Sequence, residues 1–347
     1  MIVQPLLVRK LKILGLVCIF TAIVGIIFQR ISDGFIGSAG LIVGLFLGLG
    51  FGILELFMLK KLNLRLKKIP FHFSALIKAL LYTTIILFVS NLLGLIYGYF
   101  EGKTLAEFYA SLITTDRVSE IVVALVMYSI ILLFIQIGRL LGDGVMLRVL
   151  SGKYHKPVEE ERIFMFLDLK SSTMIAEKLG HEKFYSFLNT FFHEISDPVL
   201  MTKAEIYQYV GDEVVFTWKT KDGLENANCL KIFFLIKRSV EDNREKYISE
   251  YGMIPEFKAG VHFGKVIVGQ IGDLKREIVF NGDVLNTTSR IQELCNTYNQ
   301  DLLISRRLLY RLKLPEDYNQ TYLGEVKIRG KEIELVIYGI TQKTKRT

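Results

Sequence analysis

Four long apolar segments dominate the first 142 residues of the chain. They occupy residues 13–28, 35–59, 73–100 and 121–137. A helix needs about 20 apolar residues to cross the ~30 Å hydrocarbon core of a bilayer, and each segment is near or above that length. No small-residue cleavage site follows the first segment, so we interpret it as an anchor and not as a signal peptide. Residues 1–142 are thus predicted to form an all-α transmembrane domain with four spanning helices.

The basic residues between these segments predict their orientation. Lys and Arg are concentrated in cytoplasmic loops. Three basic residues precede the first segment, and five lie between the second and the third: Arg9, Lys10 and Lys12, then Lys60, Lys61, Arg65, Lys67 and Lys68. We therefore expect an integral protein of the inner or plasma membrane, with both termini and the rest of the chain in the cytoplasm.

Residues 143–161 predict a juxtamembrane connector helix. Apolar residues recur at helical spacing up to Leu150, and Gly152 and Pro157 end the pattern. Within the apolar segments, Glu55 is a candidate functional residue because a carboxylate inside a membrane is costly. Its place near Lys60 favours the simpler interpretation of an ion pair at the cytoplasmic end.

From residue 162 onward, short apolar strands alternate with amphipathic helices. The predicted elements are a strand at 162–168, helices at 172–179 and 182–196, a hairpin at 204–218, a helix at 225–250, a strand pair at 257–271, a strand at 277–281, a helix at 283–298, a strand at 302–305 and a final pair at 321–340. This order predicts an α+β domain over residues 162–347, with helices packed on one mostly antiparallel sheet.

Charge and cysteine content narrow the possible partners. The formal net charge is +8, and residues 1–150 hold 14 Lys and Arg against 7 Asp and Glu, so most of the excess flanks the apolar segments. The nearly neutral remainder argues against a nucleic-acid partner, which would need a basic face. Cys18, Cys229 and Cys295 lack metal-ligand spacing and fit a reducing compartment.

The most informative stretch is an apolar strand that ends on a carboxylate. Asp168 closes the strand, and Ser171, Ser172 and Thr173 follow at the start of a helix. Free backbone N–H groups at a helix N-terminus can hold a phosphate, and an Asp can hold a divalent cation. Asp212 lies in the tight turn of the hairpin at 204–218. We expect both carboxylates to share a pair of metal ions on a nucleoside triphosphate.

A glycine-rich stretch lies between residues 260 and 269. Its three glycines predict a tight turn between two strands. His262 has no second His or Cys at ligand spacing, so we interpret it as structural. Lys265 is a candidate contact to phosphate.

Two further motifs supply polar and basic side chains. Asn286 and Arg290 are four residues apart and lie on one helix face. Arg329 lies in a basic turn near the C-terminus. Arginine suits phosphate because its planar guanidinium stays protonated and bonds two oxygens at once.

These motifs, in this order, resemble the catalytic domain of class III nucleotidyl cyclases, the adenylate and guanylate cyclase family, over about residues 160–340. The fold implied is a ferredoxin-like or palm-type α+β domain. The resemblance implies conversion of ATP to 3′,5′-cyclic AMP and pyrophosphate, with two Mg²⁺ or Mn²⁺ ions at Asp168, Leu169 and Asp212. Two such ions stabilise the attacking and leaving oxygens together. It also implies that Asn286 orients the ribose and Arg290 stabilises charge in the transition state.

The resemblance has implications for assembly and for base choice. In this family the metal-binding aspartates come from one subunit and the Asn/Arg pair from the other, so a homodimer with shared sites is expected. The substrate-binding candidates are Ser171, Ser172, Thr173, Gln208, Val279, Lys265 and Arg329. Gln208 and Val279 depart from the usual base-reading residues. ATP remains the favoured substrate, and a guanylate cyclase that makes cyclic GMP is the alternative.

A diguanylate cyclase and a membrane receptor or scaffold are the two alternative functions. The hairpin resembles the signature of diguanylate cyclases, but Val210 replaces its first glycine and that family has no counterpart of Asn286 and Arg290. A membrane receptor or scaffold with a catalytically weak cyclase domain would fit the unusual Gln208 and Val279. The presence of both aspartates and of the Asn/Arg pair favours an active enzyme.

Overall fold

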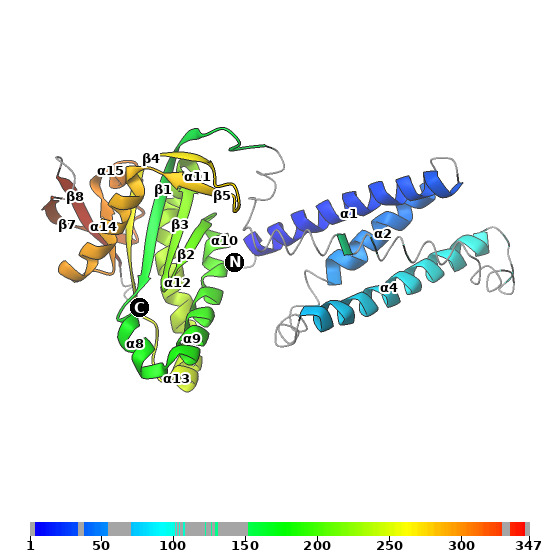
Figure 1. Cartoon of the computed structure of the whole chain (residues 1–347), viewed down its shortest axis with the longest axis horizontal. Coiled ribbons are helices and arrows are strands. Elements are labelled where there is room, and N and C mark those ends of the chain that lie inside the picture. Colours follow the sequence, from blue (N-terminus) through cyan, green and yellow to red (C-terminus); the bar gives the residue numbers. More distant parts are fainter. Residues whose placement is uncertain are drawn as a thin grey trace. The chain divides into compact units, whose positions relative to one another are not determined.

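The structure is a computed structural model that describes residues 4–33, 38–54, 71–100, 152–327 and 334–343, with a few single residues between 102 and 130. The chain divides into two compact units, Met1–Leu140 and Leu141–Thr347. Figure 1 shows both units.

The three long described segments of the N-terminal unit are helical. It contains α1 (Gln4–Asp33), α2 (Ser38–Ile53) and α4 (Phe71–Phe100). Helices α1 and α2 approach closely at glycines: a Cβ on Gly44 would overlap the backbone of Thr21. Small residues of this kind allow helices to pack closely in a membrane.

One helix in the described part of the chain, over Ile13–Ile31, is long and apolar enough to cross a membrane, and Gly40–Ile53 is a shorter apolar helix. The first three predicted apolar segments coincide with α1, α2 and α4 where they are described. The transmembrane domain with four spanning helices stays a prediction. The segment at 121–137 lies almost entirely outside the described residues, as do Glu55 and the connector up to residue 151.

The C-terminal unit is built on one eight-stranded sheet. Seven strands follow the order β2-β3-β1-β4-β6-β8-β7, and β5 pairs with the far end of β4. Only the β4–β6 pair is parallel among the described strands. The strands are β1 (Val158–Leu169), β2 (Glu205–Val210), β3 (Glu213–Lys219), β4 (Phe257–Ile271), β5 (Glu277–Asn281), β6 (Leu302–Ser305), β7 (Tyr318–Val326) and β8 (Leu335–Gln342).

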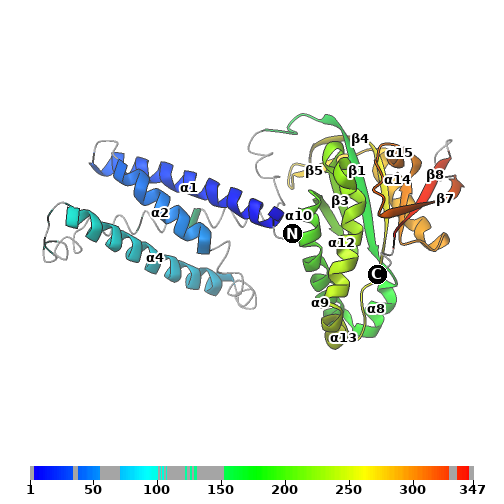
Figure 2. The same cartoon turned by 180° about the vertical axis from the view of Figure 1, so that it is seen from behind.

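Helices cover both faces of this sheet. The largest core joins the sheet to α9 and α12, and Figure 2 shows these two helices in front of the strands. On the other face, α14 packs on β4, β1 and β6. The helices are α8 (Ser172–Leu179), α9 (His181–Glu194), α10 (Ser196–Met201), α11 (Thr220–Leu224), α12 (Asn228–Asp242), α13 (Arg244–Tyr251), α14 (Asp283–Thr297) and α15 (Arg306–Leu309).

The second half of strand β1 is buried on both faces because helices cover both faces of the sheet. Ile163, Met165 and Leu167 pack into the core beneath α9 and α12. Phe164 and Phe166 alternate with them and pack on the opposite face. This double burial explains the continuous apolar run in the sequence.

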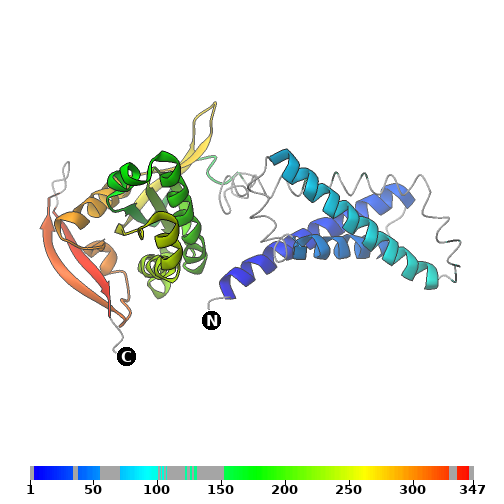
Figure 3. The same ribbon diagram turned by 90° about the horizontal axis from the view of Figure 1, so that it is seen from below.

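The predicted α+β architecture is confirmed, and three local predictions are wrong. Residues 257–271 form one continuous strand and not a strand pair, and the β4–β5 hairpin that it begins projects from the sheet (Figure 3). Its glycines serve close packing, since a Cβ on Gly260 would collide with the backbone of Gln292 in α14. The helix expected at 225–250 is broken at Asn243, where φ leaves the helical region. Residues 158–161, assigned to the connector, begin β1.

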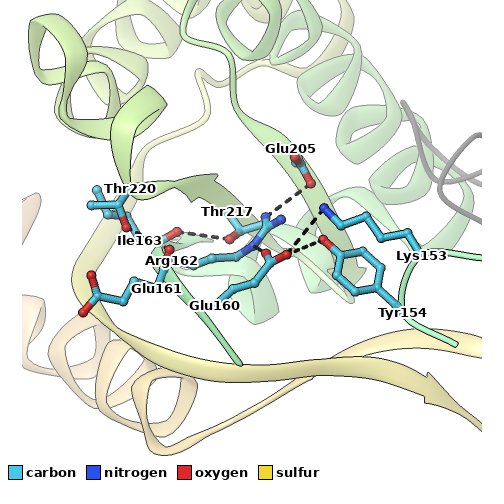
Figure 4. Close-up of polar contacts among 9 residues, drawn as sticks. All are labelled: Lys153, Tyr154, Glu160, Glu161, Arg162, Ile163, Glu205, Thr217 and Thr220. Carbon is cyan, nitrogen blue, oxygen red and sulfur yellow. Dashed lines mark hydrogen bonds and ion pairs between the residues drawn. The ribbon is translucent and has the colours of Figure 1, made fainter. Parts of the chain in front are cut away.

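A charged cluster is buried at the start of β1 (Figure 4). The side chain of Arg162 is fully buried; its Nε donates to Glu160 Oε2 at 2.8 Å, and its Nη1 lies 3.3 Å from Glu205 Oε2. Tyr154 donates to the other oxygen of Glu160 at 2.7 Å, and the guanidinium lies over the ring of Phe280. Arg162 thus ties the entry of the unit to β2 and β5.

The burial of this cluster is unequal among its members. Glu160 and Glu205 keep 17% and 28% of their side-chain surface exposed, whereas Arg162 keeps none. Burial alone would raise the pKa of Glu160, but hydrogen bonds from Tyr154 and Arg162 lower it. The buried charge of Arg162 therefore needs its two carboxylate partners, whereas the partly exposed carboxylates can still be solvated without Arg162.

The first prediction follows from this asymmetry. Glu160→Gln combined with Glu205→Gln should destabilise the unit by about 3 kcal/mol or more, because a buried charge is left without compensation, and Arg162→Met should cost clearly less. Trp218, the single tryptophan, is fully buried in β3. Its fluorescence during urea unfolding of the full chain measures both variants, and the reverse order would contradict the assignment.

Candidate active site

The ends of β1 and of the β2–β3 hairpin bring the two predicted metal-binding carboxylates together. Asp168 is the second-last residue of β1 and pairs with Glu213 of β3. Asp212 directly precedes Glu213, after a turn in which Gly211 has a φ of 63°. A left-handed residue of this kind favours glycine, which explains the Gly-Asp sequence.

Two donors hold Asp168 in place. Gln292 Nε2 of α14 donates to Oδ2 of Asp168 at 2.9 Å. The ammonium of Lys258, which is opposite Asp168 in β4, lies 3.5 Å from the same oxygen. Neither contact uses Oδ1.

The carboxylates at this site crowd one another. Burial and the nearby charge of Asp212 raise the pKa of Asp168, while Lys258 and Gln292 oppose the shift. Burial, Asp168, Asp212 and Glu293 together raise the pKa of Glu213 to about 7. Among the described residues, Lys258 is the cation that lowers the pKa of both groups. Within this part of the chain, the carboxylates at the site therefore outnumber the cations that neutralise them.

This donor set fits divalent cations bound together with a phosphate substrate. No group of three or more His, Cys, Asp or Glu side chains that could hold a metal ion was found within the described residues. Mg²⁺ is usually bound through one or two carboxylates plus substrate phosphates. Asp168 and Asp212, with the adjacent backbone at Leu169, match that arrangement, and the unneutralised charge favours cation binding.

The segment after Asp168 turns sharply into a helix. Leu169 is buried and ends β1, and Lys170 N donates to Glu256 O at 2.8 Å. Ser171 has a φ of 55° and precedes α8, which begins at Ser172 and contains Thr173. The three predicted phosphate contacts thus lie next to the carboxylates, at the N-terminus of α8.

Asn286 and Arg290 lie on the exposed side of α14. Thr288, Ile291 and Gln292 are buried on its other side, against the sheet. Arg290 Nη1 forms an ion pair with Glu293 Oε2 at 2.6 Å, and both side chains are half-exposed. Within one chain, α14 therefore directs Gln292 toward Asp168 and leaves Asn286 and Arg290 on the surface.

The remaining candidates are dispersed. Gln208 is exposed on β2, and Val279 is half-buried on β5. Lys265 lies seven residues beyond Lys258 along β4 and pairs with Glu159 at 2.7 Å, so one chain does not bring it to the carboxylates. Arg329 lies outside the described residues.

Sequence reasoning missed three residues at this site. Gln292 and Lys258 contact Asp168. The negative charges of Asp168 and Asp212 raise the pKa of Glu213. Glu213 directly follows Asp212 in the hairpin, but no role was predicted for it from the sequence. Gln292 could have been recognised from the sequence only together with Gly260. The missing side chain of Gly260 makes room for the backbone of Gln292, which lies 32 positions later in the sequence.

Comparison with known proteins agrees with this geometry. The model of the adenylate and guanylate cyclase catalytic domain matches residues 154–342. The chain therefore belongs to the adenylate and guanylate cyclase family.

Two curated relatives and one solved structure illustrate the similarity. Adenylate cyclase 2 of Rhizobium meliloti (strain 1021) is 36% identical over 211 residues, which cover 61% of this chain and 58% of that protein. An adenylate cyclase of Anabaena cylindrica is 26% identical over 51% of this chain and 36% of its own length. A bacterial light-regulated adenylyl cyclase has a TM-score of 0.56 at 16% identity, over 67% of this chain and 68% of that one, which shows a shared fold.

The second prediction concerns the dependence of stability on pH. The pKa of Glu213 is raised to about 7, so its neutral form favours the folded state, and that stability is lost as the pH rises from about 4.5 to 7. In EDTA, Glu213→Gln should reduce this fall by about 1 kcal/mol, allowing for solvent screening.

Urea unfolding followed by Trp218 fluorescence at pH 5 and pH 8 measures the effect. Glu316→Gln, at an exposed position before β7, serves as the control and should follow the parent protein. An identical pH dependence in Glu213→Gln and in the parent would contradict the raised pKa.

Proposed function

We propose that the chain is a membrane-bound adenylate cyclase that converts ATP to 3′,5′-cyclic AMP and pyrophosphate. The observation that carries this proposal is the pair of crowded carboxylates, Asp168 and Asp212, beside a helix N-terminus in a cyclase-family domain. The adenylate cyclases among its relatives support ATP as the substrate.

The side chains of this site suit an internal displacement at phosphorus. In this reaction the ribose 3′-hydroxyl releases its proton to solvent, and its oxygen bonds to the α-phosphorus as the bond to pyrophosphate breaks. Asp168, Asp212 and the backbone at Leu169 would hold divalent cations, which when bound supply charge neutralisation at the attacking and leaving oxygens. Ser171, Ser172 and Thr173 would receive the phosphates at the start of α8.

The active unit proposed is a homodimer. Asn286 and Arg290 are exposed on the side of α14 that faces away from their own sheet. A second copy of the chain, related by a twofold axis, would place them at the first copy's carboxylates. There Asn286 would orient the ribose, and Arg290 would exchange Glu293 for the phosphates. In the dimer, Lys265 and Arg329 are further candidate contacts to the triphosphate.

Base recognition is proposed at Gln208 and Val279. Gln208 is exposed on β2 and has an amide that donates and accepts, so it can pair with either purine. Val279 offers no hydrogen bond. A guanylate cyclase therefore stays the alternative, and a catalytically weak receptor or scaffold is the outcome if neither nucleotide is cyclised.

Membrane attachment is proposed for the N-terminal unit. The apolar helix over Ile13–Ile31 and the basic flanks of the predicted segments support a cytoplasmic catalytic domain. Residues 1–142 are proposed as the transmembrane domain and residues 162–347 as the catalytic domain.

The third prediction tests activity and base choice together. The purified full chain, given ATP or GTP with Mg²⁺ or Mn²⁺, should form cyclic AMP from ATP at a higher kcat/KM than cyclic GMP from GTP. Product chromatography measures both. Asp168→Asn should lose at least about a hundredfold in kcat because a metal-binding charge is removed. The absence of product from both nucleotides in a confirmed dimer would support the receptor or scaffold.

The fourth prediction tests the shared site. Asp168→Ala and Arg290→Ala should each be inactive. Mixed subunits should recover up to about a quarter of the parental activity, because half of the dimers are heterodimers with one intact site of two. A mixture that stays inactive, although both variants exchange subunits, would contradict the shared site.

A further inference from the structure

The two donor side chains that contact Asp168 approach the same carboxylate oxygen. Gln292 Nε2 and Lys258 Nζ both approach Oδ2, at 2.9 Å and 3.5 Å. The side chain of Asp168 is 24% exposed, so its carboxylate remains within reach of solvent and of a ligand. A carboxylate fixed through one oxygen presents the other in a defined direction.

Gln292 itself has little freedom. It is 4% exposed and lies on the buried side of α14. The backbone of α14 rests directly on β4, because a Cβ on Gly260 would overlap the backbone N and Cα of Gln292. The amide is therefore carried by a rigid helix and not by a loop, which is the arrangement that fixes a ligand most precisely.

The amide group is chemically suited to this position. Three carboxylates already crowd the site, so an acidic residue would add repulsion. A second lysine would add a competing positive charge beside Lys258. A neutral amide donates a hydrogen bond without changing the net charge that attracts the cations.

We propose that Gln292 is a positioning residue that holds the Asp168 carboxylate through Oδ2 and so presents Oδ1 to a divalent cation. This inference rests on the proposed function. Hydrogen bonds to a ligating carboxylate orient it, and their loss typically costs 10–100-fold in metal affinity or activity. Gln292 acts on Asp168 of its own chain, whereas Asn286 on the same helix serves the partner's site.

The first experiment measures cation binding without turnover. The full chain is titrated with Mn²⁺ in the presence of α,β-methylene-ATP, and free Mn²⁺ is followed by electron paramagnetic resonance. Gln292→Met, which keeps length and burial but removes the donor, should raise the Mn²⁺ dissociation constant about 10–100-fold. Gln292→Leu provides a second apolar replacement of different shape, and Trp218 fluorescence confirms that each variant is folded.

Thr288→Val is the matched control. Thr288 is fully buried on the same side of α14, and its hydroxyl donates to the carbonyl of Val284 in its own helix. Its replacement disturbs the same helix without touching Asp168, so the Mn²⁺ dissociation constant should stay within about twofold. An equal effect in the control and in Gln292→Met would reduce Gln292 to a packing residue and overturn the proposal.

The second experiment uses heterodimers of the Asp168→Ala and Arg290→Ala chains. Their one intact site takes Asp168 from the Arg290→Ala chain. Gln292→Met in that chain should raise the Mn²⁺ concentration needed for half-maximal activity, with kcat largely restored at saturation. The same substitution in the Asp168→Ala chain should change nothing, and an effect there would overturn the proposal.

The proposed cyclase site and the positioning role of Gln292 can be contradicted separately. A parent protein that binds no Mn²⁺ with the nucleotide analogue contradicts the proposed cyclase site and the positioning role together. A parent that binds Mn²⁺, with unchanged affinity in folded Gln292→Met and Gln292→Leu, contradicts the positioning role alone.

Discussion

The crowding of three carboxylates beside Lys258 is the constraint on which the described part of the site depends. Asp168, Asp212 and Glu213 meet at the end of β1, and burial with mutual repulsion raises the pKa of Asp168 and Glu213. Such a cluster costs stability unless protons or cations neutralise it. The fold tolerates this cost because β1 is paired on both sides and buried on both faces, so the strand cannot move to relieve the repulsion.

Helix α14 connects this cluster to the rest of the proposed reaction. Its buried side packs on β4 and places Gln292 on Asp168, and its exposed side carries Asn286 and Arg290. A single helix thus contacts Asp168 on its buried side and leaves Asn286 and Arg290 exposed on the other side. In the proposed homodimer, this exposed pair would serve the site of a second copy.

The entry of the catalytic unit is tied to the same elements. Arg162 lies on the same face of β1 as Asp168, six residues earlier, and it contacts Glu205 of β2 and Phe280 of β5. These two strands also carry Gln208 and Val279, the proposed base-reading positions. The backbone N of Gln270 also donates to the carbonyl of Tyr154, which joins the entering chain to the β4–β5 hairpin near its turn.

The sequence alone determined the class of fold, the family and the expectation that Asp168 and Asp212 lie together. Strand periodicity and short motifs are local in the chain and can be recognised without the tertiary structure. The continuous strand at 257–271 was mistaken for a pair, since its glycines look like turn residues until α14 lies against them. Gln292, Lys258 and Arg162 have roles that only the tertiary structure decided. Each acts through a partner that is distant in sequence or on a neighbouring strand, and such contacts leave no periodic signal in the chain.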